Sequence, residues 1–459
     1  MSVQAVGSAG AGEASAAGKF GWAMFDWANQ PFFTIITTFI FAPYFTATVV
    51  GDPVRGQALW GYTQAAAGIT IALLAPFLGA IADAGGRRKP WILVFSALCV
   101  VGCFALWWAV PGAAPGTLGF ILVVVVLATI GVEFAGVFNN AMLPDLVPER
   151  RMGRLSGFAW GLGYIGGLVS LFIVLLGFSF PEQPLFGLDR LTHEHDRIVG
   201  PLSAVWLLIF IIPLFVWTPD RAASGLAAVD AARRGIATLL GTLRALPRFR
   251  NIALYLVARM FYYDGQAAIF AFGGIYAAGL FDWGTTQLGV FGIIILVFAA
   301  LGCFVGGWLD DRLGSKKTII LAVVGLVISA LGVVSIGGGK ALFVFDVGMP
   351  QPGGALFDST AERIFLVISV LLGIFGGPAQ AASRTMLARL APPEMSGEFF
   401  GLYALSGKAT AFLAPLTIGV VTDLFQSQRI GIAMVLPFLL LGLFLFIGVK
   451  EERAPATEH

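Results

Sequence analysis

Charged residues are scarce in this 459-residue chain, where Asp, Glu, Lys and Arg make up 12% of the composition. A typical soluble domain has about a quarter of its residues charged. Hydrophobic residues make up 58% here, and the formal net charge is only +2. This composition excludes an ordinary soluble protein. It also argues against a nucleic-acid partner, which would require dense positive charge.

Cysteine and histidine are equally scarce, with three residues of each. Cys99, Cys103 and Cys303 all lie inside apolar runs, which predicts packing residues and no disulfide. His193 and His195 belong to the sequence THEHD, and two histidines one residue apart would point in opposite directions in a strand. We therefore expect a solvated loop there, with no metal site and no cofactor.

Long apolar runs are what the chain does contain. A helix of about 20 apolar residues crosses a ~30 Å hydrocarbon core, whereas a membrane barrel would show alternating ten-residue strands. The sequence therefore predicts an all-α polytopic membrane protein with the lipid bilayer as its partner. Twelve spans are expected, at about 20–48, 57–83, 90–111, 116–143, 153–179, 200–218, 251–280, 286–310, 316–337, 362–389, 397–424 and 430–449.

The basic residues indicate how these spans are oriented. Most Lys and Arg residues fall in segments on one side of the predicted membrane, which by the positive-inside rule is the cytoplasm and holds both termini. The segment 219–250 is rich in Arg, and its apolar spacing predicts an amphipathic helix on the inner leaflet. The expected organisation is a disordered tail at 1–18, a six-helix bundle at 19–218, this linker, a second six-helix bundle at 251–450, and a tail at 451–459.

Similar sequence segments occur in the two predicted bundles. The stretch GAIADAGGRRK at Gly79–Lys89 has a copy, GWLDDRLGSKK at Gly307–Lys317, about half the chain length later. A second pair, at Asn140–Gly157 and Arg384–Gly401, also shares residues at a constant offset. A repeat of this length indicates duplication, and parallel halves are the arrangement of alternating-access transporters, whose solute site lies between the halves.

The first copy of the glycine-rich stretch has the features of a cytoplasmic gate. Glycines allow close helix approach and a sharp turn, and Asp83 at the membrane exit can pair with a following arginine. A simple topology anchor is the alternative. The candidate gate residues in the two copies are Gly79, Asp83, Gly86, Arg87, Arg88, Asp311 and Gly314.

Five ionisable residues fall inside predicted spans, where each costs about 2.5–3.5 kcal/mol on insertion scales. We expect Asp264 to face a central cavity, and Lys408 or Arg259 to pair with Glu133 or Asp26 across the bundle. Static salt bridges between helices, with no part in coupling, are the alternative. With their polar neighbours, the candidate substrate or coupling-ion residues are Asp26, Asn29, Gln30, Glu133, Arg259, Tyr263, Asp264, Gln266, Gln380 and Lys408.

The stretch at Gly79–Lys89 resembles the loop motif of the major facilitator superfamily, except that Ala84 replaces a basic residue often found there. Longer segments, among them GWAMFDWANQPFFTIITTFIFAPYF at 21–45 and NNAMLPDLVPERRMGRLSGFAWGLGYIGG at 139–167, resemble its vacuole-effluxer branch. The resemblance implies that Asp83 latches onto the start of the eleventh span, near Ser396 and Gly397. Eukaryotic members of this branch are associated with release of amino acids from the vacuole. The resemblance therefore implies that the protein lies in the vacuolar membrane if it is eukaryotic and in the cell membrane if it is bacterial.

No glycine-rich nucleotide loop precedes a helix, so ATP-driven transport is not supported. We therefore expect a secondary active transporter and not an enzyme. It would move a small polar solute, with amino-acid efflux as the leading case, protons as candidate coupling ions and a monomer as the working unit. A sugar or drug carrier, or a transport-inactive receptor or scaffold of the same fold, are the alternatives.

Overall fold

The structure is a computed structural model. It describes residues 13–85, 87–147, 149–222, 246–350, 356–391 and 409–451, together with residues 230, 233, 399, 402–403 and 406–407. The side chains at 75–77, 79–85, 144, 149–154, 156–157, 304, 311 and 388 also lie outside the description. The predicted linker helix at 219–250 falls mostly on residues that are not described.

The first span is an irregular helix. It begins as α1 (Ala16–Pro31), where the Ser15 hydroxyl accepts a hydrogen bond from the Gly18 amide at 3.0 Å. The helix therefore includes residues 16–18, which we had assigned to the tail. It continues as the π-helical turns η1 (Phe32–Phe39) and η2 (Phe45–Val49), with α2 (Phe41–Tyr44) between them.

The other elements follow the predicted spans. In the first half they are α3 (Pro53–Gly85), α4 (Lys89–Ala105), η3 (Leu106–Trp108), α5 (Pro115–Leu146), α6 (Glu149–Val174), η4 (Leu175–Ser179), η5 (Leu185–Gly187), α7 (Glu194–Arg197), α8 (Val199–Phe210) and α9 (Ile212–Trp217). In the second half they are η6 (Leu246–Phe249), α11 (Arg250–Phe281), α12 (Thr285–Leu313), α13 (Ser315–Ser335), the antiparallel pair β1 (Lys340–Ala341) and β2 (Phe345–Asp346), α14 (Thr360–Leu390), α16 (Leu413–Phe425), α17 (Gln428–Ala433) and α18 (Val435–Ile447).

Among the described residues, nine helical segments are long and apolar enough to cross a membrane. They are Ala16–Val49, Lys89–Trp108, Pro115–Leu143, Phe158–Ser179, Glu194–Trp217, Thr285–Asp310, Ser315–Ser335, Thr360–Leu387 and Gln428–Ile447. The predicted count of twelve would need α3, α11 and the shorter apolar helix α16 as well. The helical membrane fold is thus established, and the full span count stays a prediction.

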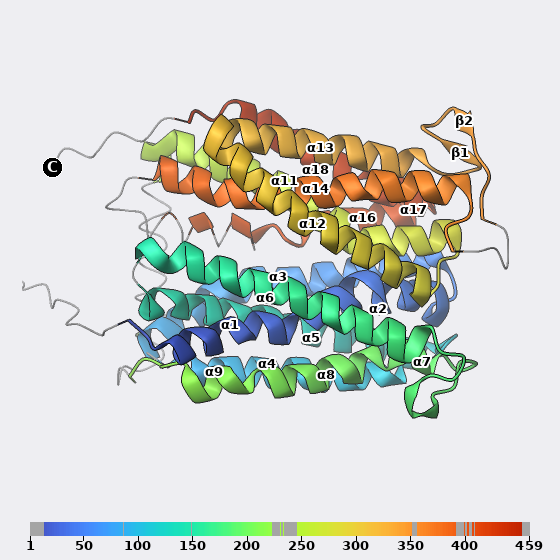
Figure 1. Ribbon diagram of the computed structural model, residues 1–459, viewed down its shortest axis with the longest axis horizontal. Helices are drawn as coiled ribbons and strands as arrows, with labels where there is room; N and C mark the ends of the chain where they lie inside the picture. Colours follow the sequence, from blue (N-terminus) through green and yellow to red (C-terminus); the bar gives the residue numbers. More distant parts are fainter. Residues whose placement is uncertain are drawn as a thin grey trace, which may run out of the picture.

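Figure 1 shows the helices of the first half, in blue to green, beside those of the second half, in yellow to red. The described chain starts and ends at one end of the helices, which we call the terminal end. The segments that carry α7 and the β1–β2 hairpin lie at the opposite end, which we call the loop end. The two halves therefore run in the same direction along their helices, as the internal repeat predicts.

At the loop end the halves touch through α3 and α16. The Gln57 amide donates hydrogen bonds to Thr422 Oγ1 at 2.8 Å and to the Gln428 carbonyl at 3.1 Å. Gly61 allows a close approach, because a methyl group there would lie 2.7 Å from the Pro415 carbonyl oxygen. Only glycine lets the two backbones come so near.

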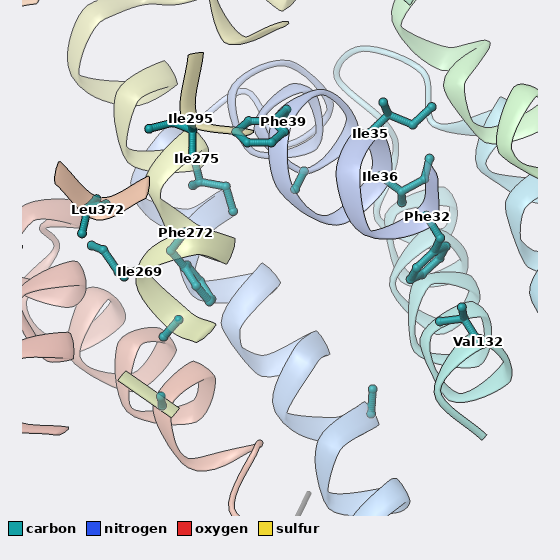
Figure 2. Close-up of a cluster of buried hydrophobic side chains, with 14 of the residues drawn as sticks. Phe32, Ile35, Ile36, Phe39, Val132, Ile269, Phe272, Ile275, Ile295 and Leu372 are labelled. Atoms are coloured by element: carbon teal, nitrogen blue, oxygen red, sulfur yellow. The ribbon is translucent and has the colours of Figure 1, made fainter. Parts of the chain in front are cut away.

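The apolar core also crosses the boundary between the halves. Figure 2 shows Phe39 of η1 near Ile275 of α11 and Ile295 of α12. All three are at most 5% exposed. Lipid tails are as apolar as these side chains, so close packing holds such contacts together in a membrane.

Each half closes its terminal end with a carboxylate from the segment after its last helix. Asp220, which follows α9, accepts hydrogen bonds from the first amides of α4, including Lys89 N at 3.1 Å. Glu451, which follows α18, accepts in the same way from the first amides of α13, including Ser315 N at 2.8 Å. A carboxylate in this position pairs free amides and complements the helix dipole.

Candidate functional site

A cavity of about 170 Å³ lies between the two halves. Its walls come from the first span and α6 on one side, and from α11, α12 and α14 on the other. The lining residues are Gln30, Phe33, Thr34, Thr38, Phe39, Tyr164, Gln266, Ala267, Phe270, Ile295, Leu296, Ala299, Gly376, Gly377 and Gln380. The lining is therefore mostly apolar with a few polar groups, as in sites for small molecules.

Three glutamines on three different helices are among the six polar residues that line this cavity. Gln266 donates through Nε2 to the Gly376 carbonyl at 2.8 Å. Its Oε1 atom is buried and has no hydrogen-bond partner among the described residues. Buried polar atoms are rarely left unpaired, so Gln266 Oε1 is an acceptor available to a solute. Gln30 and Gln380 are half-buried.

The first span loses regular α-helical geometry where it borders the cavity. Pro31 lies inside the helix and removes one backbone donor. The π-helical turn that follows supplies Phe33, Thr34, Thr38 and Phe39 to the lining. Such π-helical turns are rare and are often found at functional sites.

An acidic and a basic side chain from opposite halves lie on the terminal-end side of the cavity. Asp26 lies one turn before Gln30 on α1, and Arg384 lies one turn beyond Gln380 on α14. The Arg384 guanidinium is near enough to act electrostatically on the Asp26 carboxylate. It also lies 5.8 Å from the Trp160 ring of α6, so Arg384 reaches from its own half towards the other.

Arg259 does not make the ion pair that we predicted. It is 6% exposed and donates through Nη1 to the Tyr403 carbonyl at 3.0 Å and to Ser406 Oγ at 2.9 Å. Its guanidinium lies 3.6 Å from the centre of the Tyr403 ring and 4.8 Å from that of Tyr263. The expected pairing with Glu133 or Asp26 is wrong for Arg259, because carbonyl, hydroxyl and aromatic groups of its own half hold this cation.

Asp264 does not line the cavity, contrary to our expectation. It is 3% exposed and lies close to Thr410, and its Oδ2 atom has no hydrogen-bond partner among the described residues. Gln266, Ala267 and Phe270 of the same helix line the cavity. Residues turn by about 100° each along a helix, so Asp264 lies on a face about 115° from the middle of this group.

The other candidate residues are divided between the cavity and its surroundings. Gln30, Gln266 and Gln380 line it. Asn29 is buried in α1, Glu133 is half-buried in α5, and neither belongs to the lining. Tyr263 lies under the Arg259 guanidinium, and Lys408 falls outside the described residues. The structure therefore brings together at one cavity the glutamines of the predicted first, seventh and tenth spans.

The gate residues are only partly described. Gly86, Ser396 and Gly397 lie outside the described residues, as do any contacts of the Asp83 and Asp311 side chains. Arg88 is buried and donates through Nη1 to Asp145 Oδ2 at 2.6 Å, whereas Arg87 is exposed. The latch of Asp83 against the other half therefore stays a prediction.

In the second gate copy the structure describes the contacts of Asp310, the residue before Asp311, whose role stays a prediction. Asp310 is buried and accepts from Ser315 Oγ at 2.6 Å, with Arg389 Nη1 3.7 Å from the same oxygen. Gly314 has φ of 85° between α12 and α13, and a methyl group there would lie 3.0 Å from Glu451 Oε2. The turn therefore requires glycine both for its backbone angle and for its space.

Our sequence analysis missed Arg384, Tyr164 and Thr34 as site residues. Arg384 lies inside a predicted span, but we counted it among the cytoplasmic basic residues. A charge within an apolar run was the signal that could have identified it. Nothing in the sequence singled out Tyr164 or Thr34, because their role depends on how α6 and the first span pack.

Comparison with known proteins agrees with this geometry. The family profile described as "Vacuole effluxer Atg22 like" matches residues 46–459. The chain is 26% identical over 447 residues to "Uncharacterized MFS-type transporter YxiO" of Bacillus subtilis (strain 168), covering 94% of this chain and 95% of that protein. It is 24% identical over 317 residues to "Autophagy-related protein 22-1" of Aspergillus fumigatus, covering 66% of this chain and 49% of that protein. The chain thus matches about half the length of this fungal relative.

Among solved structures, the D-xylose-proton symporter has a TM-score of 0.65 at 14% identity, covering 95% of this chain and 97% of that one. Identity this low establishes the fold alone. The fold is the two-bundle fold of major facilitator transporters, which confirms the predicted resemblance. Because the family profile spans most of the sequence, this multi-pass membrane protein belongs to the Atg22-like vacuole effluxer family of MFS-type transporters.

Proposed function

We propose that the chain is a secondary active transporter that moves a small polar solute by alternating access, with amino acids as the solute class. The observation that carries the proposal is the cavity between the halves, with one glutamine from each of three helices and opposite charges beside it. Sites of this kind form between the two halves of a transporter and open in turn to either side.

The size of the cavity supports a small solute. Pockets for drug-sized ligands have volumes of about 300–1,000 Å³, and this cavity is about 170 Å³. A drug carrier is therefore the less favoured alternative. The unpaired Gln266 Oε1 offers an acceptor to an ammonium or hydroxyl donor.

The charges beside the cavity support a zwitterionic solute. The Asp26 carboxylate can bind an ammonium group, and the Arg384 guanidinium can bind a carboxylate through two parallel hydrogen bonds. The two residues belong to opposite halves and act on each other electrostatically. A sugar would use the glutamines and would make no use of the opposite charges of Asp26 and Arg384.

The direction of opening follows if the terminal end is cytoplasmic, as the basic residues predict. The loop end, where Gln57 contacts Thr422 and Gln428, would then be the closed external side. The twelve-span topology, with both termini in the cytoplasm, forms part of the proposal, as does proton coupling.

The test is a ligand-stabilisation screen of the purified chain. Unfolding temperature is measured at two pH values with amino acids, sugars and nucleosides. A solute at 100 times its Kd stabilises the folded state by about 2.7 kcal/mol. We expect amino acids to raise the Tm of the wild type, and Gln266→Ala and Arg384→Ala to reduce that rise.

Arg55→Ala is the matched control, because Arg55 is exposed in the first turn of α3 and does not line the cavity. Its response to ligand should equal that of the wild type. If sugars raise the Tm and amino acids do not, the proposed solute class is wrong and sugars take its place. A chain that responds to no solute and supports no flux in vesicles would favour a receptor or scaffold.

A further inference from the structure

Two histidines and an aspartate meet at the loop end, outside the cavity. His193 Nδ1 lies 2.9 Å from Asp196 Oδ2, and His195 Nε2 lies 3.5 Å from the same oxygen. One donor atom from each residue can be chosen so that all three lie within 4.8 Å of one another. They are three side chains of the kind that bind transition-metal ions.

The side chains of His193 and His195 both lie near Asp196, so our expectation that they would point in opposite directions is wrong. That expectation assumed an extended backbone. His193 instead has φ of 54° and ψ of 33°, the left-handed conformation, and it caps α7. The turn stacks the two imidazole rings, with centroids 5.6 Å apart and planes 20° from parallel.

Asp196 is the member of this cluster that most requires a cation. Its side chain is 6% exposed, and among the described residues no lysine or arginine nitrogen lies within 4 Å of its carboxylate. The neighbouring Arg197 donates to the carbonyls of Trp107 and Thr192 instead. Buried charges in proteins are usually paired or bound to a metal.

The two donor distances to Asp196 Oδ2 are close to those in a tetrahedral site. Zinc binds histidine nitrogen and carboxylate oxygen at about 2.0–2.2 Å, so two ligands of a tetrahedron lie about 3.3 Å apart. The observed separations of 2.9 Å and 3.5 Å bracket this value. The His193 side chain is 36% exposed, which leaves a path for an ion and room for water as the fourth ligand.

We propose that His193, His195 and Asp196 form a binding site for a divalent transition-metal ion, with zinc as the probe. The ligand atoms are His193 Nδ1, His195 Nε2 and Asp196 Oδ2. This site is separate from the solute cavity, and its ion is a resident ligand of the loop end and not the solute.

Neighbouring groups hold the cluster in place and connect it to the second half. The hydroxyl of Thr285, the first residue of α12, donates to Asp196 Oδ1. The Tyr44 ring stacks on His193, with centroids 5.6 Å apart. Hydrogen bonds to the second oxygen of a ligating carboxylate orient it and tune the metal. An ion at this site would therefore favour the closed loop end, because Thr285 belongs to the other half.

The competing explanation is a hydrogen-bonded histidine–aspartate cluster that binds no ion. To distinguish the two, the full chain in detergent is first dialysed against a chelator and then titrated with zinc by calorimetry. We expect one ion per chain, and at least a tenfold loss of affinity in His195→Ala and in Asp196→Asn. His459→Ala removes the last residue's imidazole and should bind as the wild type does.

Cobalt provides a readout that needs no variant. Tetrahedral Co²⁺ bound to the wild-type chain should give intense visible absorption bands that zinc displaces. Zinc binding that persists unchanged in the His193→Ala/His195→Ala double variant would overturn the proposal. So would a wild-type chain that gives no tetrahedral cobalt bands, even if the variants fail to fold.

Discussion

Asp264 is the residue whose chemistry depends most on its surroundings. It lies in the middle third of α11 and is 3% exposed, and one carboxylate oxygen has no partner among the described residues. The nearby cation Arg259 donates its hydrogen bonds to Tyr403 and Ser406 instead. A charge at this depth is costly, so we expect Asp264 either to carry a proton or to gain a partner in another state of the transport cycle.

The substitution Asp264→Asn tests this expectation because it keeps the shape and removes the titration. We expect flux in reconstituted vesicles to fall several-fold, or to lose its dependence on pH, while the Tm stays within a few degrees of the wild type. Asp282→Asn is the control, because Asp282 is exposed at the end of the same helix and asparagine tolerates its φ of 56°. Unchanged flux with an unchanged pH response would remove Asp264 from the mechanism.

At the residue scale, the sequence predicted residue types better than partners. Gln30, Gln266 and Gln380 were predicted as polar groups inside spans, and the structure places them around one cavity. Arg259 was predicted to need a carboxylate, but aromatic rings and a backbone carbonyl satisfy it instead. Partners could not be predicted, because they depend on the rotation of each helix about its own axis.

At the scale of elements, each half is closed at its terminal end by a carboxylate that caps a helix start. Asp220 caps α4 from the segment after α9, and Glu451 caps α13 from the segment after α18. The two halves also share a lysine at the start of the capped helix. Lys89 donates to the Phe215 carbonyl and Lys316 to the Ile447 carbonyl, both at 2.9 Å. The same contact therefore recurs in both halves, as a duplication predicts.

Removal of either cap should weaken its own half. We expect Asp220→Ala and Glu451→Ala each to lower the free energy of unfolding by about 1 kcal/mol, the usual cost of losing a helix cap. The effects should add in the double variant, because the two sites lie in different bundles. Thermal or denaturant unfolding in detergent measures both, with Glu182→Ala, an exposed loop residue, as the control. A variant as stable as the wild type would show that the cap contributes nothing.

Helix positions were largely predictable, and helix ends were less so. The predicted span 90–111 corresponds to Lys89–Trp108, because apolar runs determine which residues cross a membrane. The predicted span 200–218 begins earlier, at Glu194, because α7 consists of the charged residues of a sequence that looked like a loop. The caps at Asp220 and Glu451 could not be predicted, because they join residues far apart in the chain.

For the whole molecule, the main feature is the contact between the halves at the loop end. At the loop end the halves meet through hydrogen bonds and a close glycine approach. The cavity lies between this contact and the charges of Asp26 and Arg384. Alternating access requires the contact to break and re-form during each cycle, because the solute must enter or leave through that end.

The most direct measurement is flux through a molecule whose loop end can be fixed. Gln57 and Thr422 are replaced by cysteine in a background without Cys99, Cys103 and Cys303, and are joined by a short reducible crosslinker. Amino-acid flux is then followed in vesicles before crosslinking, after crosslinking and after reduction. Our account predicts flux before crosslinking, at least a tenfold loss after it and recovery on reduction. Flux that continues unchanged through the crosslinked molecule would contradict it.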